Sequence, residues 1–185
     1  MCDPELVNQR KRSIVRLRQA GCALIIGAAM AMGAVAKTLG EVSIGETLRE
    51  ASMQGLSGAT QKLSEFRGKP LIINVWASWC GPCLQEMGSL ERLQQTYGGK
   101  QFNIIGISTD DYWINAKGFL QKTRISFPNF IDNRLFLENM LGADRLPLTL
   151  LVDAKGKVLA KVYGAQAWDS PPALAMIGKT LQVKL

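Results

Sequence analysis

The sequence contains no histidine among its 185 residues. This absence excludes Ser-His-Asp triads, Cys-His dyads and every metal site that needs an imidazole ligand. It also excludes c-type haem attachment, which needs histidine directly after a C-x-x-C pair, because Leu84 stands at that position. We therefore expect no bound metal or other cofactor, and any chemistry must come from other side chains.

Long apolar runs are also scarce, and the longest uncharged stretch lies near the start of the chain. Residues 20–36 carry no charge, follow the basic stretch "RKRSIVRLRQ" and end on the A-x-A pair Ala34 and Ala36. This pattern is typical of an export signal, and the run is shorter than the roughly 18–20 residues that span a bilayer. We predict that residues 1–36 are a signal peptide cleaved after Ala36, with an uncleaved membrane anchor as the alternative. Residues 37–185 then form one periplasmic domain, either soluble or tethered by residues 20–36.

Charge is not concentrated in any one part of the chain. The net charge of +7 divides into +3 for residues 1–36 and +4 for the rest, where lysine and arginine are scattered. No stripe of basic and aromatic residues is present, so we expect a solvated surface and no nucleic-acid partner. We also expect a monomer.

Cysteine is rare, and two of the four cysteines, Cys2 and Cys22, precede the predicted cleavage point. The remaining pair, Cys80 and Cys83, is too small a set of thiols for a zinc site and closes too short a loop to stabilise much as a structural disulfide. In an oxidising compartment such a pair favours a redox-active dithiol. An inert buried pair is the alternative.

The apolar pattern predicts alternating strands and helices. We expect buried strands at 70–77 and 102–108, helices at 83–97, 113–123 and 134–141, and a hairpin at 149–164. A last helix begins after Ser170 as N-cap, and the turn-rich segment 37–69 holds one or two short strands near 48–53 and a helical turn at 64–66. This order predicts an α/β fold, a central mixed β-sheet with helices on both faces.

The two cysteines differ in their expected environment. Cys80 lies at a helix N-terminus, where free backbone N–H groups and the helix dipole stabilise a thiolate. Cys83 lies one turn inside and stays a shielded thiol. Gly81 keeps access open, and Pro82 presets the backbone of the first turn. The spacing therefore predicts Cys80 as nucleophile and Cys83 as resolving thiol.

The motif Trp79-Cys80-Gly81-Pro82-Cys83 resembles the thioredoxin active site, and more of the chain resembles the TlpA/ResA branch of exported thioredoxin-like reductases. The supporting segments are "LSEFRGKPLIINVWASWCGPC", Glu86 of "CLQEM", "FPNFID" and "RLPLTLLVDAKGKV". The resemblance implies a thioredoxin-like fold with a helix and strand inserted near 112–131. It also implies a cis peptide between Leu146 and Pro147 that faces the cysteines, with the Leu146 backbone pairing with an extended substrate. A plain proline at a strand start is the alternative.

Two departures from the family pattern concern the proton acceptor of Cys83. Thioredoxin carries a buried acid where Asn74 stands, and the ResA subgroup often carries glutamate where Gly81 stands. Glu86, one helical turn beyond Cys83, could accept the proton, but we expect it to be an exposed helix glutamate.

The resemblance implies a reductase of protein disulfides, recharged by a membrane thiol carrier. Its clients are proteins with disulfides or cysteine pairs, for example in cytochrome c or copper-site maturation. A peroxiredoxin is excluded because no P-x-x-x-T-x-x-C pattern precedes Cys80 or Cys83, and a copper metallochaperone because histidine is missing. The alternative is an assembly factor or chaperone that binds client cysteines without turnover.

Overall fold

The structure is a computed structural model that describes residues 40–185. The signal or anchor predicted for residues 1–36 lies outside this part of the chain. Within residues 40–185, no helix combines the length and apolar character needed to cross a membrane.

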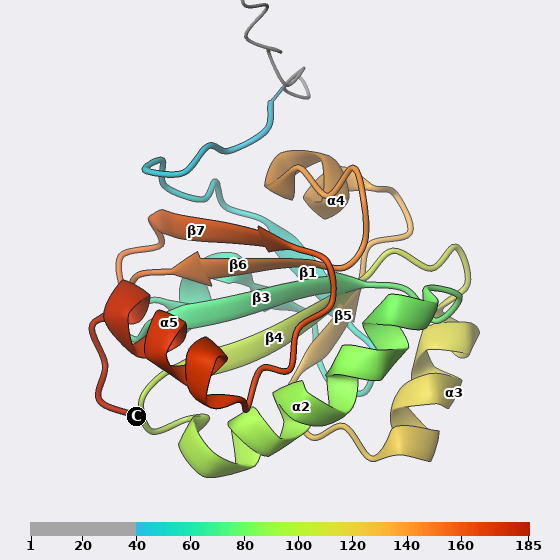
Figure 1. The fold of residues 1–185 in the computed structure, drawn as a ribbon. Coiled ribbons are helices and arrows are strands. Elements are labelled where there is room, and N and C mark those ends of the chain that lie inside the picture. The colour runs from blue at the N-terminus through green and yellow to red at the C-terminus, as the bar shows by residue number, and fades with distance from the viewer. Residues whose placement is uncertain (1–39) are drawn as a thin grey trace, which may run out of the picture. The chain divides into compact units, whose positions relative to one another are not determined.

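Within residues 40–185, seven strands and five helical segments follow one another (Figure 1). The strands are β1 (Ser52–Gly55), β2 (Gln61–Lys62), β3 (Leu71–Trp76), β4 (Asn103–Ser108), β5 (Asn129–Ile131), β6 (Leu148–Val152) and β7 (Val158–Tyr163). The helices are the 3-10 turn η1 (Leu63–Phe66), α2 (Gly81–Tyr97), α3 (Trp113–Thr123), α4 (Phe136–Leu141) and α5 (Pro171–Leu181).

The strands form one mixed sheet in the order β2-β1-β5-β4-β3-β6-β7. The three central strands β3, β4 and β5 are parallel, whereas β6 and β1 pair antiparallel with β3 and β5. Every residue of β3 is buried, as expected for a strand with helices on both faces. The carboxyl ends of the parallel strands meet at one edge of the sheet, which is where α2 begins.

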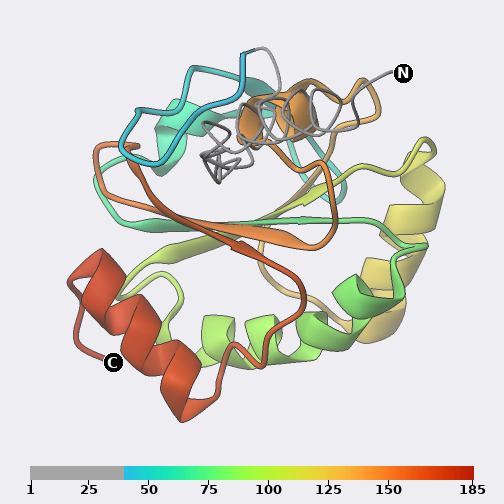
Figure 2. The same ribbon diagram turned by 45° about the horizontal axis from the view of Figure 1, so that its top comes forward.

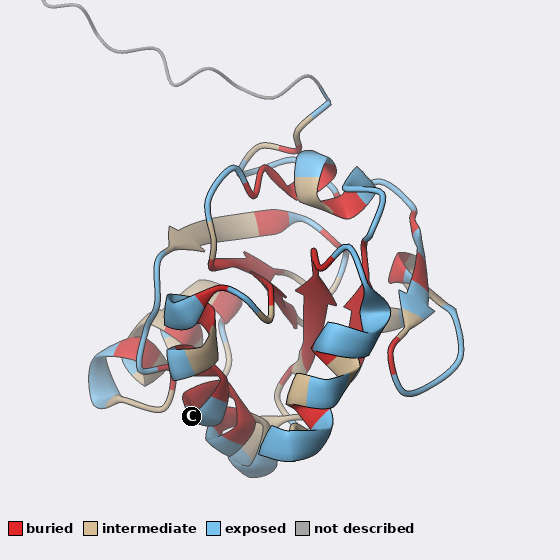
Figure 3. Cartoon of the chain, turned by 90° about the vertical axis from the view of Figure 1, so that its right-hand side faces the viewer, coloured by how far each residue is buried: buried red, intermediate tan, exposed pale blue. Residues whose placement is uncertain are grey.

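Each face of the sheet has its own apolar core. Because side chains alternate along a strand, Ile72 and Trp76 of β3 pack in the core with α2, α3 and α5, while Ile73 and Val75 pack in the other. The second core is closed by α4 and by residues 42–66. Figures 1 and 2 show α2, α3 and α5 on one side of the sheet and α4 on the other, and Figure 3 shows the buried central strands between them.

The predicted mixed sheet with helices on both faces is confirmed, including the helix and strand expected near 112–131, which are α3 and β5. Two local predictions were wrong. The short strands lie at 52–55 and 61–62, so the first overlaps the predicted 48–53 only at Ser52 and Met53 and the second lies beyond it. Helix α4 begins at Phe136 and not at 134, because Leu135 has a left-handed φ of 55° and the Asp132 carboxylate accepts the Phe136 N–H at 3.0 Å.

Candidate functional site

The two cysteines lie where strand β3 gives way to helix α2. Cys80 is the N-cap of α2, and its Sγ accepts the backbone N–H of Cys83 at 3.2 Å. The sulfurs are joined in a disulfide with an S–S distance of 2.02 Å. Cys80 is 6% exposed and Cys83 is completely buried. Only one of the two sulfurs is therefore within reach of another molecule, and it lies at the positive end of a 17-residue helix.

The residues around Cys80 leave its outer side open. Trp79 is 71% exposed. Gly81 has no heavy atom within 4 Å of the place where a Cβ would stand, and Pro82 occupies the first turn of α2, where its missing N–H costs no hydrogen bond. The loop before the motif is held by Asp110, whose carboxylate accepts the N–H and O–H of Ser78 at 2.9 and 2.6 Å.

A cleft of about 730 Å³ opens beside this turn. The peptide bond between Leu146 and Pro147 is cis, in agreement with the resemblance, and Leu146 lines the cleft together with Trp79 and Cys80. The other lining residues come from loops at the same edge of the sheet: Gly81, Pro82, Thr109, Asp111, Leu135, Glu138, Ala143, Asp144 and Arg145. Cys83 does not line it. The arrangement presents one sulfur to an incoming segment of another protein.

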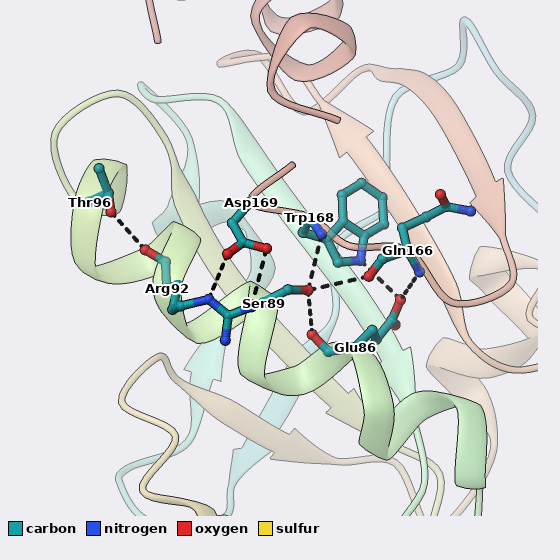
Figure 4. A network of polar contacts seen from close by, with 7 residues as sticks. All are labelled: Glu86, Ser89, Arg92, Thr96, Gln166, Trp168 and Asp169. Atoms are coloured by element: carbon teal, nitrogen blue, oxygen red, sulfur yellow. Dashed lines mark hydrogen bonds and ion pairs between the residues drawn. The ribbon is translucent and has the colours of Figure 1, made fainter. Parts of the chain in front are cut away.

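Glu86 is buried, which corrects the expectation of an exposed helix residue. It is 2% exposed, and its carboxylate accepts hydrogen bonds from the Asn74 amide at 2.7 Å, the Trp168 indole at 2.9 Å and the Gln166 backbone at 3.0 Å. Figure 4 shows the contacts of Glu86 with Gln166 and Trp168, together with Ser89, whose Oγ accepts the backbone N–H of Trp168 at 3.0 Å. The network fastens α2 to the segment that leads into α5.

Burial has the largest influence on the pKa of the Glu86 carboxyl. Loss of hydration raises its pKa, and the bonds from Trp168, Gln166 and Asn74 only partly offset this. Glu86 follows Cys83 by three residues on the same buried side of α2. The structure therefore places a buried carboxyl of raised pKa one helical turn beyond the buried Cys83.

Asn74 connects this carboxyl to the sheet. Its side chain is completely buried on β3 and donates both to Glu86 and to the Thr149 hydroxyl at 3.0 Å on the neighbouring strand β6. Its Oδ1 has no hydrogen-bond partner within the described residues. An ionised aspartate at this position could not donate to Glu86, so asparagine fits a site whose acid comes from the helix.

Sequence reasoning missed the partners of Glu86. Trp168 and Gln166 come from a segment with no motif, and Trp168 is a fully buried indole in a turn, whereas Ser89 lies on α2 itself. The available signal was the tryptophan itself, because a buried indole needs an acceptor for its N–H.

The described residues contain no group of three or more histidine, cysteine, aspartate or glutamate side chains that could hold a metal ion.

Comparisons with known proteins agree with this geometry. Residues 43–177 match the family model described as Redoxin. The chain is 31% identical over 126 residues to the thiol-disulfide oxidoreductase ResA of Bacillus thuringiensis subsp. konkukian, covering 68% of this chain and 73% of that protein. It is 30% identical over 123 residues to ResA of Geobacillus thermodenitrificans, covering 66% and 71% of the two chains.

Solved structures with a similar fold also carry the names of thiol-disulfide exchange proteins. A protein assigned as thiol:disulfide interchange protein DsbE from Chlorobium tepidum superposes with a TM-score of 0.70 at 26% identity, covering 76% of this chain and 99% of that one. A thiol-disulfide oxidoreductase from Bacteroides fragilis superposes with a TM-score of 0.62 at 25% identity, covering 71% and 99%. The fold is thus thioredoxin-like, and the chain belongs to the Redoxin family as a ResA-like thiol-disulfide oxidoreductase.

Proposed function

We propose that this enzyme is an exported reductase of protein disulfides that works through Cys80 and Cys83. The observation that carries the proposal is the unequal placement of the two sulfurs. Cys80 caps α2 and lines the cleft, whereas Cys83 is completely buried one turn behind it.

In the proposed reaction the reduced enzyme attacks a client disulfide with the Cys80 thiolate. One client sulfur leaves as a thiolate and takes up a proton, and a mixed disulfide joins Cys80 to the other. Cys83 then loses its proton and attacks Cys80, which releases the second client sulfur. Two electrons pass to the client, and the disulfide between Cys80 and Cys83 is formed.

The supporting residues are assigned as follows. Trp79 and the Leu146 backbone flank the client segment, with the cis Pro147 presenting that backbone to the cleft. Gly81 and Pro82 shape the first turn of α2 and leave the Cys80 sulfur accessible. Glu86, held by Asn74, accepts the proton of Cys83 during resolution.

The cellular setting follows from the N-terminal pattern. Residues 1–36 act as a signal peptide or anchor that places residues 37–185 in the periplasm, where the protein works as a monomer. A reductant in an oxidising compartment needs a supply of electrons, so a membrane thiol carrier recharges the disulfide. The clients are proteins with disulfides or cysteine pairs, such as those matured for cytochrome c or copper sites.

The test compares single-cysteine variants of the full chain. Cys83→Ser should trap clients as mixed disulfides that dithiothreitol releases, whereas Cys80→Ser should trap none, and both should lose insulin reduction. Cys22→Ser is the matched control and should keep full activity. Trapping by Cys80→Ser and not by Cys83→Ser would reverse the assignment, and a wild type that binds clients without reducing insulin would favour the non-turnover assembly factor.

The direction of electron flow is tested by the midpoint potential of the Cys80/Cys83 pair. We expect a value more negative than roughly −200 mV, in the range of thioredoxin and glutaredoxins. The chain has no histidine to stabilise the reduced thiolate as an imidazolium would, so the disulfide is comparatively favoured and the dithiol is a strong donor. A midpoint near −120 mV, as in DsbA, would contradict the reductase assignment.

A further inference from the structure

The cleft beside Cys80 differs in charge from the rest of the protein. Residues 37–185 carry a net charge of +4, yet three of the residues that line the cleft are acids, namely Asp111, Glu138 and Asp144. The single basic lining residue, Arg145, stacks its guanidinium 4.5 Å from the ring centroid of Tyr163. Arg134 is exposed in a nearby loop but does not line the cleft.

Two of these acids accept no hydrogen bond and form no ion pair within the described part of the chain, although Asp144 lies near enough to Tyr163 to add to the effect of burial in raising the pKa of its phenol. All 13 carboxylate side chains of residues 37–185 lie in residues 40–185, and all apart from Asp111 and Asp144 accept a hydrogen bond there. The other eleven cap turns and helices, bind lysine or arginine, or belong to buried networks. Asp111 and Asp144 are exposed, and both line the cleft that contains the accessible sulfur.

The third acid, Glu138, has a partner within the described residues. The Thr109 hydroxyl contacts the Glu138 carboxylate, whose pKa is raised by burial and by the nearby charge of Asp132. Asp132 itself accepts the N–H groups of Phe136 and Glu138, so it serves the start of α4. The cleft carboxylates that accept no hydrogen bond from the described residues are therefore those of Asp111 and Asp144.

Apolar surface completes the cleft. Trp79, next to Cys80, is 71% exposed, and Leu135 is 40% exposed. An exposed indole face attracts a guanidinium or ammonium group, and neighbouring carboxylates strengthen this attraction. A sulfur, an aromatic face and two carboxylates that accept no hydrogen bond from residues 40–185 thus line one cleft.

Given the proposed function, on which this inference rests, we propose that the cleft selects disulfides in segments that carry lysine or arginine close to the cysteine. The client segment lies extended along Leu146, with its cation between Trp79 and the carboxylates of Asp111 and Asp144. The charge pattern determines which disulfides are reduced quickly, while the two cysteines carry out the exchange.

The test uses two synthetic peptides, each with one intramolecular disulfide and the same sequence apart from two residues beside the cysteine. One peptide carries two arginines there and the other two glutamates. Pre-reduced full-length protein is mixed with each peptide, and the second-order rate constant of peptide reduction is measured. The arginine peptide should react about tenfold faster at low ionic strength, and added salt should shrink the ratio.

The matched variants are Asp111→Asn with Asp144→Asn, and Asp169→Asn as control. The double variant should lower the rate ratio to about twofold, while Asp169→Asn, which removes a carboxylate bound to Arg92 and outside the cleft, should keep it. The ratio cancels any change in the reactivity of the Cys80 thiolate, because both peptides react with the same thiolate.

The outcomes separate the two proposals. Equal rates for the two peptides in the wild type, or an unchanged ratio in the double variant, would overturn the docking inference and leave the reductase intact. Reduction of neither peptide would overturn the proposed function and with it the inference.

Discussion

Glu86 and the pair Asp111 and Asp144 place the same chemical group in opposite settings. Glu86 is 2% exposed and accepts three hydrogen bonds, whereas Asp111 and Asp144 are exposed and accept none from the described residues. Both sets lie close to the first turns of α2, one behind Cys83 and the other beside Cys80. The comparison teaches that the partners of a carboxylate, more than its position in the sequence, separate a group that holds the fold together from one that is free to meet a ligand.

The largest difference is expected in the free energy of unfolding when Glu86 and Asp111 are each replaced by alanine. Glu86→Ala removes the acceptor of two buried donors, the Trp168 indole and the Asn74 amide, and the free energy of unfolding should fall by roughly 2–4 kcal/mol. Asp111→Ala breaks no hydrogen bond of the described residues and should leave it unchanged within about 0.5 kcal/mol. Urea unfolding of the oxidised proteins measures both. Equal losses would show that burial and partners do not distinguish the two carboxylates.

The second prediction concerns pH. Burial raises the pKa of Glu86 in the folded state above its unfolded value of about 4.3, so the folded protein binds more protons between these two pKa values. The stability linked to Glu86 is therefore fully present below the unfolded pKa and is lost as the pH rises through the folded pKa. Glu86→Gln does not titrate, so the free energy of unfolding of the wild type minus that of the variant should fall across this interval.

The control for the pH series is Asp111→Asn, which should follow the wild type at every pH. Asp132 and Glu138 also have raised pKa values, but they are present in wild type and variant alike and cancel in the difference. A difference that is constant with pH, or that grows as the pH rises, would contradict the raised pKa of Glu86.

Much of the architecture could be predicted because its signals are local. The apolar run at 70–77 and the three- to four-residue repeat after Cys83 give β3 and α2, and the proline and glycine of the motif mark their junction. The position of Cys80 as N-cap followed from this junction alone. The resemblance to a known family contributed the cis bond before Pro147, which has no local periodicity to signal it.

The burial of Glu86 could not be predicted because it depends on contacts between distant segments. Its donors are 12, 80 and 82 residues away in the chain, and a helix glutamate with no visible partner is expected to face solvent. Asn74 stands where thioredoxin has a buried acid, and its amide donates a hydrogen bond to an acid of the next helix, Glu86. The start of α4 was misplaced for a similar reason, since the capping carboxylate of Asp132 lies before the helical pattern begins.

A smaller effect is expected when one donor to Glu86 is removed. Trp168→Phe keeps an aromatic ring in the buried site but removes the indole N–H, and the free energy of unfolding should fall by about 1 kcal/mol. The bond from Trp168 is the largest of the contacts that lower the pKa of Glu86, so this pKa should rise further. The pH interval over which stability is lost should then extend to higher pH than in the wild type. An unchanged interval would show that the indole does not influence the carboxyl.

The smallest effect on stability is expected for the exposed pair of Arg92 and Asp169, which lies at the end of the same network. The Arg92 Nε donates to Asp169 at 2.6 Å, and their side chains are 63% and 33% exposed. The pKa of Asp169 is lowered by Arg92, so any stability from the pair is present above the unfolded pKa of aspartate and is lost as the pH falls.

Solvent and salt screen such a pair, so Asp169→Asn should leave the urea midpoint unchanged at neutral pH, in low and in high salt. The contrast with Trp168→Phe, one residue away in the chain, is the sharpest form of the comparison between buried and exposed carboxylates. A loss from Asp169→Asn as large as that from Trp168→Phe would mean that the contacts in Figure 4 act as one cooperative unit, in which the exposed ion pair supports the buried carboxyl.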